Sequence, residues 1–318
     1  MRVIENIFAF RKNAKKPVVL ALGNFDGIHL GHQKLLDYVV SQARQFQGQA
    51  AVFTFREHPQ AVLHPGHAPE RLQSSEQKLN FFRERGIEVC FLQHFDKRFA
   101  AHSAEDFVKN ILARRLGIRE ICLGYNARFG RGRAGDADLL RKLGPECGFE
   151  VFQAKPVVWK GSPVSSTAVR AAVRDGKMDL AANLLGRPWS LAGKVLHGEA
   201  RGKKLGFPTA NLDLKGYVCP AFGVYAIRAV MLTSGKTKPA KKILRGVANL
   251  GVRPTFGGGR PVLEAHFFSF NKNIYGKKIE IFFLKKLRKE KKFKSLADLQ
   301  KQIRKDIQAA QLVLKNKI

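Results

Sequence analysis

The stretch Leu22-Gly23-Asn24-Phe25-Asp26-Gly27-Ile28-His29-Leu30-Gly31-His32 decides the fold of the first half of this chain. An apolar run over residues 18–21 precedes it, and residues 34–40 follow with apolar side chains at helical spacing. This order predicts a buried strand, a glycine-rich turn and a helix. Glycines let backbone approach a ligand closely, and a helix N-terminus attracts phosphate.

Two histidines mark the start of that helix. His29 and His32 are three residues apart, so we expect them on one helix face. Imidazoles at a helix N-terminus can stabilise charge that develops on a phosphorus atom. The pattern predicts a site for a nucleoside triphosphate, although a dinucleotide fold with incidental histidines or a structural turn would also use it. The turn residues of the predicted site are Gly23, Phe25, Asp26, Gly27 and Gly31.

Length and composition indicate a soluble globular protein. The 318 residues suggest two domains, and 45% are hydrophobic and 26% charged. No apolar run reaches the roughly 18 residues that span a bilayer, and the N-terminus has no signal-peptide layout. The four cysteines form no Cys-x-x-Cys pair, which favours free thiols in a reducing cytoplasm. We therefore expect a cytoplasmic protein without a membrane span.

The net charge of +32 is concentrated in the second half of the chain. Residues 187–318 hold 29 Lys+Arg against 7 Asp+Glu, whereas residues 1–186 hold 28 against 18. Such an excess favours anionic partners, but no aromatic residues alternate with the basic ones as in a base-stacking surface. We expect no functional nucleic-acid partner, attribute the charge to solubility or to the source proteome, and leave a weak homo-oligomer open.

Strands alternate with helices up to about residue 186. The strands are expected at 51–55, 88–92, 120–124 and 149–154, the helices at 75–85, 103–115 and 136–143, and loops at 56–69 and 94–99. This alternation predicts a parallel, doubly wound sheet of the Rossmann-like type, which binds ligands at the carboxyl ends of its strands. Residues 124–126 follow one such end, and the arginines of loop 126–135 could clamp phosphate or form an exposed basic turn.

A second set of polar residues opens a helix near residue 165. Hydroxyl groups at a helix start, with an arginine one turn later, suit a phosphate. The simpler alternative is an N-cap, which would explain one serine but not the whole set. The set consists of Ser165, Ser166, Thr167 and Arg170.

Period-2 alternation replaces helical periodicity after residues 185–189. Strands are expected at 193–197, 223–231, 243–250, 261–270 and 278–284, and an amphipathic helix with a capping box at 295–316. The spacing predicts a small antiparallel barrel followed by a C-terminal helix. We therefore expect two domains, 1–186 and 187–318.

Three features of the barrel region suit phosphoryl chemistry. The basic loop with Gly198, Gly202 and Gly206 could cover phosphates. Thr209 and Asn211 are two residues apart, so in an extended segment their oxygens could reach Mg²⁺ together. Glu264 lies on an expected strand among apolar neighbours, where a general base is one reason to keep a carboxylate. Turn formation or packing is the alternative for each.

Motifs in order along the chain carry a resemblance. They lie at 23–32, 55–59, 124–130, 165–170, 206–211, 223–226, 249–256 and 288–293, together with Glu264. Over its whole length the chain resembles the prokaryotic bifunctional riboflavin kinase and FMN adenylyltransferase (FAD synthetase) family. The resemblance implies an N-terminal nucleotidyltransferase domain and a C-terminal barrel of the riboflavin kinase type.

The resemblance also implies two reactions that use ATP, Mg²⁺ and flavins. The C-terminal domain would phosphorylate riboflavin to FMN, with Thr209 and Asn211 at the metal and phosphates and Glu264 activating the 5′-hydroxyl. The N-terminal domain would join AMP to FMN, giving FAD and pyrophosphate. There His29 and His32 would stabilise charge at the α-phosphate, Asn126 would contact substrate, and the set at 165–170 would hold the triphosphate.

Two positions depart from the family pattern. Glu57 stands where the family has a proline, and Ala127 where an aromatic residue is usual. We expect altered FMN affinity rather than loss of the reaction. The competing hypotheses are an aminoacyl-tRNA synthetase-like nucleotidyltransferase, which predicts a Lys-Met-Ser-Lys-Ser-type loop that the sequence lacks, and a non-enzymatic regulator, which predicts damaged catalytic positions.

Overall fold

The computed structural model describes residues 1–10, 16–197, 206–232, 243–252 and 261–315. They form two compact units with separate cores. Unit 1 contains Met1–Pro69 and Ser75–Ser165, and unit 2 contains Glu70–Ser74 and Ser166–Ile318. A short piece of the N-terminal half thus packs with the C-terminal unit.

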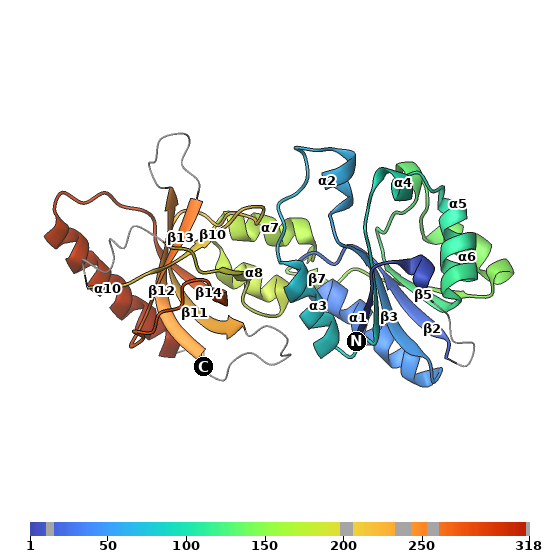
Figure 1. The fold of residues 1–318 in the computed structure, drawn as a ribbon, viewed down its shortest axis with the longest axis horizontal. Helices are drawn as coiled ribbons and strands as arrows, with labels where there is room; N and C mark the ends of the chain where they lie inside the picture. The colour runs from blue at the N-terminus through green and yellow to red at the C-terminus, as the bar shows by residue number, and fades with distance from the viewer. Residues whose placement is uncertain (11–15, 198–205, 233–242, 253–260, 316–318) are drawn as a thin grey trace. The chain divides into compact units, whose positions relative to one another are not determined.

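Unit 1 is built on a six-stranded parallel sheet in the order β1-β4-β3-β2-β5-β6. Figure 1 labels β2, β3 and β5 of this sheet. The strands are β1 (Arg2–Ile4), β2 (Val18–Leu22), β3 (Gln49–Phe55), β4 (Val89–Gln93), β5 (Ile118–Gly124) and β6 (Glu150–Ala154). This confirms the predicted doubly wound sheet. The edge strand β1, only three residues long, was not predicted.

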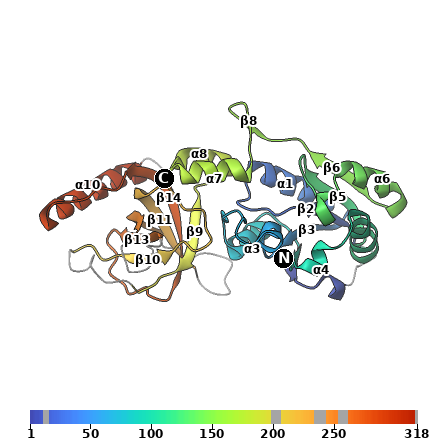
Figure 2. The ribbon, with the colours of Figure 1, turned by 90° about the horizontal axis from the view of Figure 1, so that it is seen from above.

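Helices cover both faces of this sheet, which Figure 2 shows from above. On one face α1 (Leu30–Gln45) and α3 (Ser75–Glu84) pack with Val19 and Ala21 of β2. On the other face the π-helical segment η2 (Phe107–Leu116) and α6 (Ala137–Cys147) pack with Leu20 and Leu22. Because both faces are covered, β2 is buried along its whole length.

Two segments expected as loops contain short helices. In α2 (Pro59–Leu63) a proline begins the helix and the His58 ring caps it. In α4 (Lys97–Ala100) the Asp96 carboxylate accepts a hydrogen bond from the Phe99 N–H at 2.7 Å. Proline at the first helical position and aspartate at the N-cap are standard start signals, but these helices are too short for a periodic pattern. The remaining short elements are η1 (Ile7–Ala9), α5 (Ala104–Asp106), η3 (Arg131–Arg133), β7 (Val158–Trp159) and β8 (Ser162–Pro163).

Unit 2 is built on a six-stranded antiparallel sheet in the order β10-β13-β12-β11-β14-β9. The strands are β9 (Ser190–Lys194), β10 (Ala210–Asp213), β11 (Gly223–Leu232), β12 (Ile243–Val252), β13 (Pro261–Phe267) and β14 (Lys278–Arg288). A bridge between Leu196 and Asn211 joins its two ends, so the sheet nearly closes into the predicted barrel. β9 begins earlier than the expected 193–197, and β10 was predicted only as an extended segment.

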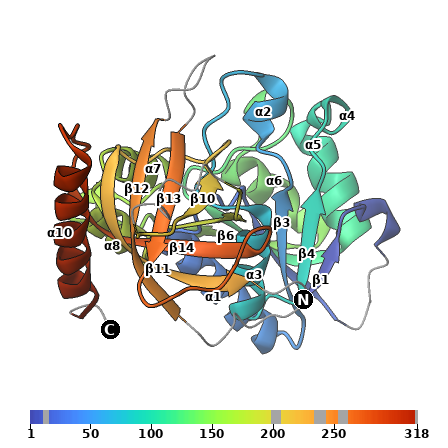
Figure 3. The same cartoon turned by 60° about the vertical axis from the view of Figure 1, so that its left-hand side comes forward.

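Three helices pack in the described part of unit 2. They are α7 (Ser166–Arg174), α8 (Met178–Leu185) and α10 (Leu296–Lys315). α10 lies along β11 and β12 (Figure 3), where Ala310 and Leu314 are buried. Its start has the predicted capping box, since the Ser295 hydroxyl accepts from the Asp298 N–H and donates to the Asp298 carboxylate. The predicted apolar stripe packs mainly through its second half, whereas Leu296 at the start of the helix is 69% exposed.

Within the described residues, no helix is long and apolar enough to cross a membrane. All four cysteines are free, and Cys90 and Cys122 are buried as expected.

Candidate functional site

The glycine-rich turn leaves the carboxyl end of β2 in an unusual backbone conformation. Phe25, Gly27 and Ile28 have φ angles of 50°, 81° and 41°. Left-handed backbone costs on the order of 1–3 kcal/mol at a residue with a side chain, so packing must hold it. Phe25 and Ile28 are completely buried, and Phe25 packs edge-on against Phe82. A Cβ on Gly23 would lie 3.2 Å from the Phe25 ring, which explains that glycine.

The turn brings the two histidines together at the start of α1. His29 is the N-cap, and its Nδ1 accepts a hydrogen bond from the His32 N–H at 3.4 Å. The two rings stack with centroids 3.8 Å apart. Since Nδ1 of neutral His29 accepts, its proton is on Nε2, which is therefore a donor. A Cβ on Gly31 would lie 3.1 Å from the His29 ring, so this glycine leaves room for the imidazole.

Side chains from α1 (Gln33) and from α3 (Lys78) support the same turn. The Gln33 amide donates to the Ile28 carbonyl at 2.9 Å and accepts from Arg85 at 2.7 Å. Lys78, which no sequence motif indicated, donates to the Asn24 carbonyl at 3.1 Å. The sequence contains part of the information that places Lys78, because it is one helical turn from Phe82, and these are the two buried residues of α3.

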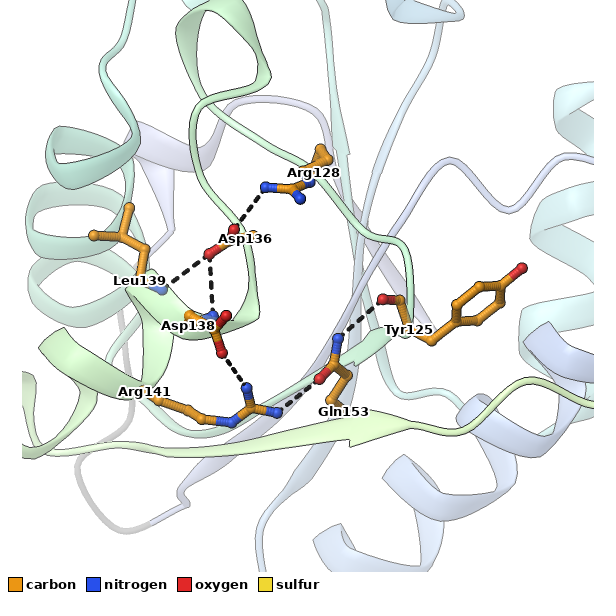
Figure 4. A network of polar contacts seen from close by, with 7 residues as sticks. All are labelled: Tyr125, Arg128, Asp136, Asp138, Leu139, Arg141 and Gln153. Atoms are coloured by element: carbon orange, nitrogen blue, oxygen red, sulfur yellow. Dashed lines mark hydrogen bonds and ion pairs between the residues drawn. The ribbon is translucent and has the colours of Figure 1, made fainter.

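The loop after β5 is held by its own polar network (Figure 4). Asp136 caps α6, accepting from the Leu139 N–H at 3.0 Å, and pairs with Arg128 at 2.6 Å. The pKa of Asp136 lies below its ordinary value, mainly because its carboxylate accepts a hydrogen bond from the Leu139 N–H and also because the Arg128 charge is nearby. Arg128 therefore has a structural partner, which favours the basic-turn alternative for that arginine. Asn126 is exposed in the turn that the Ala127 N–H closes on the Gly124 carbonyl.

The predicted hydroxyl and arginine set spans the point in the sequence where the chain passes from unit 1 to unit 2. Ser165 is the last residue of unit 1, and Ser166 begins α7 and the second segment of unit 2. Thr167 is exposed, whereas Arg170 is buried and donates through Nε to the Glu70 carbonyl at 2.8 Å.

The barrel aligns three polar residues across neighbouring strands. Glu264 on β13 is directly opposite Asn211 on β10 and opposite Asn249 on β12. Directly opposite side chains on a sheet have Cβ atoms roughly 5 Å apart. Burial alternates along β13, with Leu263, Ala265 and Phe267 buried and Glu264 half-buried between them.

Not every predicted kinase residue can be placed. Asn211 is only 5% exposed, and Thr209 is half-buried just before β10. Gly206 is exposed with a φ of 85°. Gly198 and Gly202 lie outside the described residues.

Two protein families match this chain, one over each half. Residues 11–168 match the FAD synthetase family and residues 185–314 match the riboflavin kinase family. The bifunctional riboflavin kinase/FMN adenylyltransferase of Escherichia coli (strain K12) is 38% identical over 96% of both chains. This chain belongs to the bifunctional riboflavin kinase/FMN adenylyltransferase family. The same-named protein of Haemophilus influenzae is 38% identical over 92% of both chains.

A solved structure has the same fold over the whole length. It is described as a macrolide-efflux protein from Streptococcus pneumoniae and covers 96% of both chains with a TM-score of 0.83 and 30% identity. That activity is stated for the streptococcal protein alone, and we use the likeness only for the fold.

The two departures from the family pattern have structural partners in unit 1. The Glu57 carboxylate accepts from the Phe95 N–H at 3.4 Å and contacts the His94 ring at 2.9 Å, so it ties the loops after β3 and β4 together. Ala127 packs against the core on the η2 face of the sheet.

Proposed function

We propose that the riboflavin kinase domain converts riboflavin to FMN and that the FAD synthetase domain converts FMN to FAD, each with ATP. Family membership over nearly the whole chain is the observation that carries this function. The residue roles below are supported by the geometry of each unit.

In the kinase domain Glu264 is the proposed general base. It accepts the proton of the riboflavin 5′-hydroxyl as that oxygen attacks the γ-phosphorus of ATP, and ADP leaves. A half-buried carboxylate on a rigid strand can hold one hydroxyl in line, and positioning supplies much of the rate in phosphoryl transfer. Gly206 and the preceding loop with Gly198 and Gly202 are proposed to cover the phosphates.

Thr209 and Asn211 are the proposed residues at Mg²⁺. A hydroxyl and an amide oxygen are hard donors of the kind that Mg²⁺ prefers, and Asn211 is buried opposite Glu264. When bound, Mg²⁺ would neutralise phosphate charge.

In the adenylyltransferase domain the turn before α1 is the proposed phosphate site. A phosphate oxygen of FMN attacks the α-phosphorus of ATP, and pyrophosphate leaves. The Nε2–H of His29 and the stacked His32 donate to the charge that develops there. Gly23, Phe25, Asp26, Gly27 and Gly31 shape the turn, and Asn126, Ser165, Ser166, Thr167 and Arg170 are proposed to bind the substrates.

We also propose 1–186 and 187–318 as the limits of the two catalytic domains, which differ from the packing units because α7 and α8 pack in unit 2. A cytoplasmic location and small molecules as the main partners complete the proposal. Free buried thiols support the location.

A flavin assay tests the two activities and separates them. Purified protein is incubated with ATP, Mg²⁺ and either riboflavin or FMN, and the flavins are resolved by chromatography. Glu264→Ala is expected to abolish FMN formation while FAD still forms from supplied FMN. His29→Ala is expected to do the reverse, and loss of both activities in either folded variant would contradict separate sites. A folded wild-type protein that forms neither product would refute the function.

A further inference from the structure

Lys78 places a buried ammonium group beside the glycine-rich turn. The side chain comes from α3 and is only 8% exposed. Its Nζ donates to the Asn24 carbonyl at 3.1 Å, the Phe55 carbonyl at 3.1 Å and the Thr54 hydroxyl at 3.4 Å. Three acceptors match the three N–H groups of a protonated lysine.

These three acceptors belong to the two strand ends where the site is built. Asn24 follows β2 and begins the strained turn, whereas Thr54 and Phe55 end β3. The Thr54 hydroxyl donates to the same Asn24 carbonyl at 3.1 Å. The amine therefore fastens the turn to the neighbouring strand one residue before the left-handed Phe25.

A structural role alone does not require a charge here. An apolar side chain would fill the space between α3 and the sheet without the cost of burying an ammonium group. The charge is useful where a backbone carbonyl must be held in one orientation, because hydrogen bonds from a charged donor are about twice as strong as neutral ones.

We propose that Lys78 is a positioning residue of the adenylyltransferase site, whose charged amine fixes the Asn24 carbonyl and thereby the turn that carries His29. The inference rests on the proposed role of that turn. Lys78 does not touch substrate, since its three donors point at protein acceptors. It acts through the turn, so its loss should reduce turnover more than ATP binding.

The protonation of Lys78 gives this role a distinct signature. Burial lowers the pKa of Lys78, while the nearby Asp26 carboxylate opposes the shift. Burial raises the pKa of the Cys90 thiol to about 12, so the thiol stays neutral below that pH. A neutral amine has two N–H donors and cannot keep all three bonds. As the pH rises, adenylyltransferase activity should therefore begin to decline at a lower pH than it would if Lys78 had the pKa of an ordinary lysine.

The test compares Lys78→Met and Lys78→Arg with wild type in the full chain. FAD formation from supplied FMN is measured between pH 7 and pH 10, and FMN formation from riboflavin in the same preparations is the internal control. Lys142→Met, at an exposed position on α6, is the matched control. We expect Lys78→Met to lower kcat for FAD formation about 100-fold, as a misplaced site does, with a much smaller change in KM for ATP. The kinase activity of Lys78→Met should stay within about twofold of wild type. Its rate of FAD formation should not show the decline at alkaline pH that the wild type shows.

Lys78→Arg keeps the test decisive if the methionine variant does not fold. Arginine keeps a charge that does not titrate in this range, so we expect partial activity without the alkaline decline. A folded Lys78→Met with wild-type kcat, or a Lys78→Arg with the wild-type alkaline decline, would overturn the inference. A wild-type protein that makes no FAD would instead refute the proposed function itself.

Discussion

At the scale of a residue, the buried carboxyl group of Glu120 on β5 makes the stability of the folded state depend on pH. The side chain is 4% exposed, and its Oε1 accepts from the Tyr38 hydroxyl at 2.9 Å. Its Oε2 is buried without a hydrogen-bond partner among the described residues. Burial raises the pKa of Glu120, and the hydrogen bond from Tyr38 opposes the shift. The folded state thus binds this proton more tightly than the unfolded chain does.

We predict that Glu120→Gln is stabilised relative to wild type as the pH rises. When the folded pKa lies above the unfolded one, stability is highest below the unfolded pKa and is lost as pH rises through the folded pKa. The neutral amide has no such loss, so its advantage should be larger at pH 8 than at pH 4. Urea denaturation at both pH values measures it. An equal difference at the two pH values would contradict the prediction, whatever its sign.

At the scale of an element, the sequence predicted what depends on local pattern. The buried strand β2 and the turn after it follow from an apolar run and glycines adjacent in sequence, and the helix α10 follows from its apolar stripe and capping box. The pairing of Asn211 with Glu264 depends on the register between strands some 50 residues apart in sequence. The burial of Lys78 likewise depends on which carbonyls end β2 and β3. Neither the pairing nor the burial follows from the periodicity of a single segment of sequence.

An ion pair fixes α10 to the end of β14. Arg288 donates through Nε and Nη2 to the Asp306 carboxylate at 2.8–3.1 Å, and Gln302 donates to the same carboxylate at 2.9 Å. The Asp306 side chain is 7% exposed and that of Arg288 is 23% exposed. Removing one partner of a buried pair leaves an uncompensated charge.

We predict that Asp306→Ala destabilises unit 2. Breaking a fully buried pair costs about 3–5 kcal/mol, and the remaining exposure of Arg288 reduces our expectation to about 2–3 kcal/mol. Lys305→Ala, at an exposed position on the same helix, is the control and should change little. Hydrogen exchange of α10 and of the barrel measures the effect. Unchanged protection in α10 would show that the ion pair does not anchor the helix.

At the scale of the whole molecule, the division of the chain differs between packing and sequence pattern. The sequence pattern changes near residue 186, and the riboflavin kinase family match begins at residue 185. In the structure α7 and α8 already belong to unit 2, and α8 packs against β14. The loop between these helices fits tightly, since a Cβ on Gly176 would lie 2.8 Å from the Lys286 side chain and 3.3 Å from the Tyr225 hydroxyl.

These contacts predict that two C-terminal fragments behave differently. A fragment of residues 187–318 exposes the surface of β14 that α8 covers, whereas a fragment of residues 166–318 keeps α7 and α8 in place. Both lack Glu70–Ser74, so the comparison isolates the two helices. We expect the longer fragment to unfold at higher urea and to phosphorylate riboflavin, and the shorter one to bind more of a hydrophobic dye. Equal stability of the two would place the boundary of the folding unit after α8, at the limit that the sequence pattern suggests.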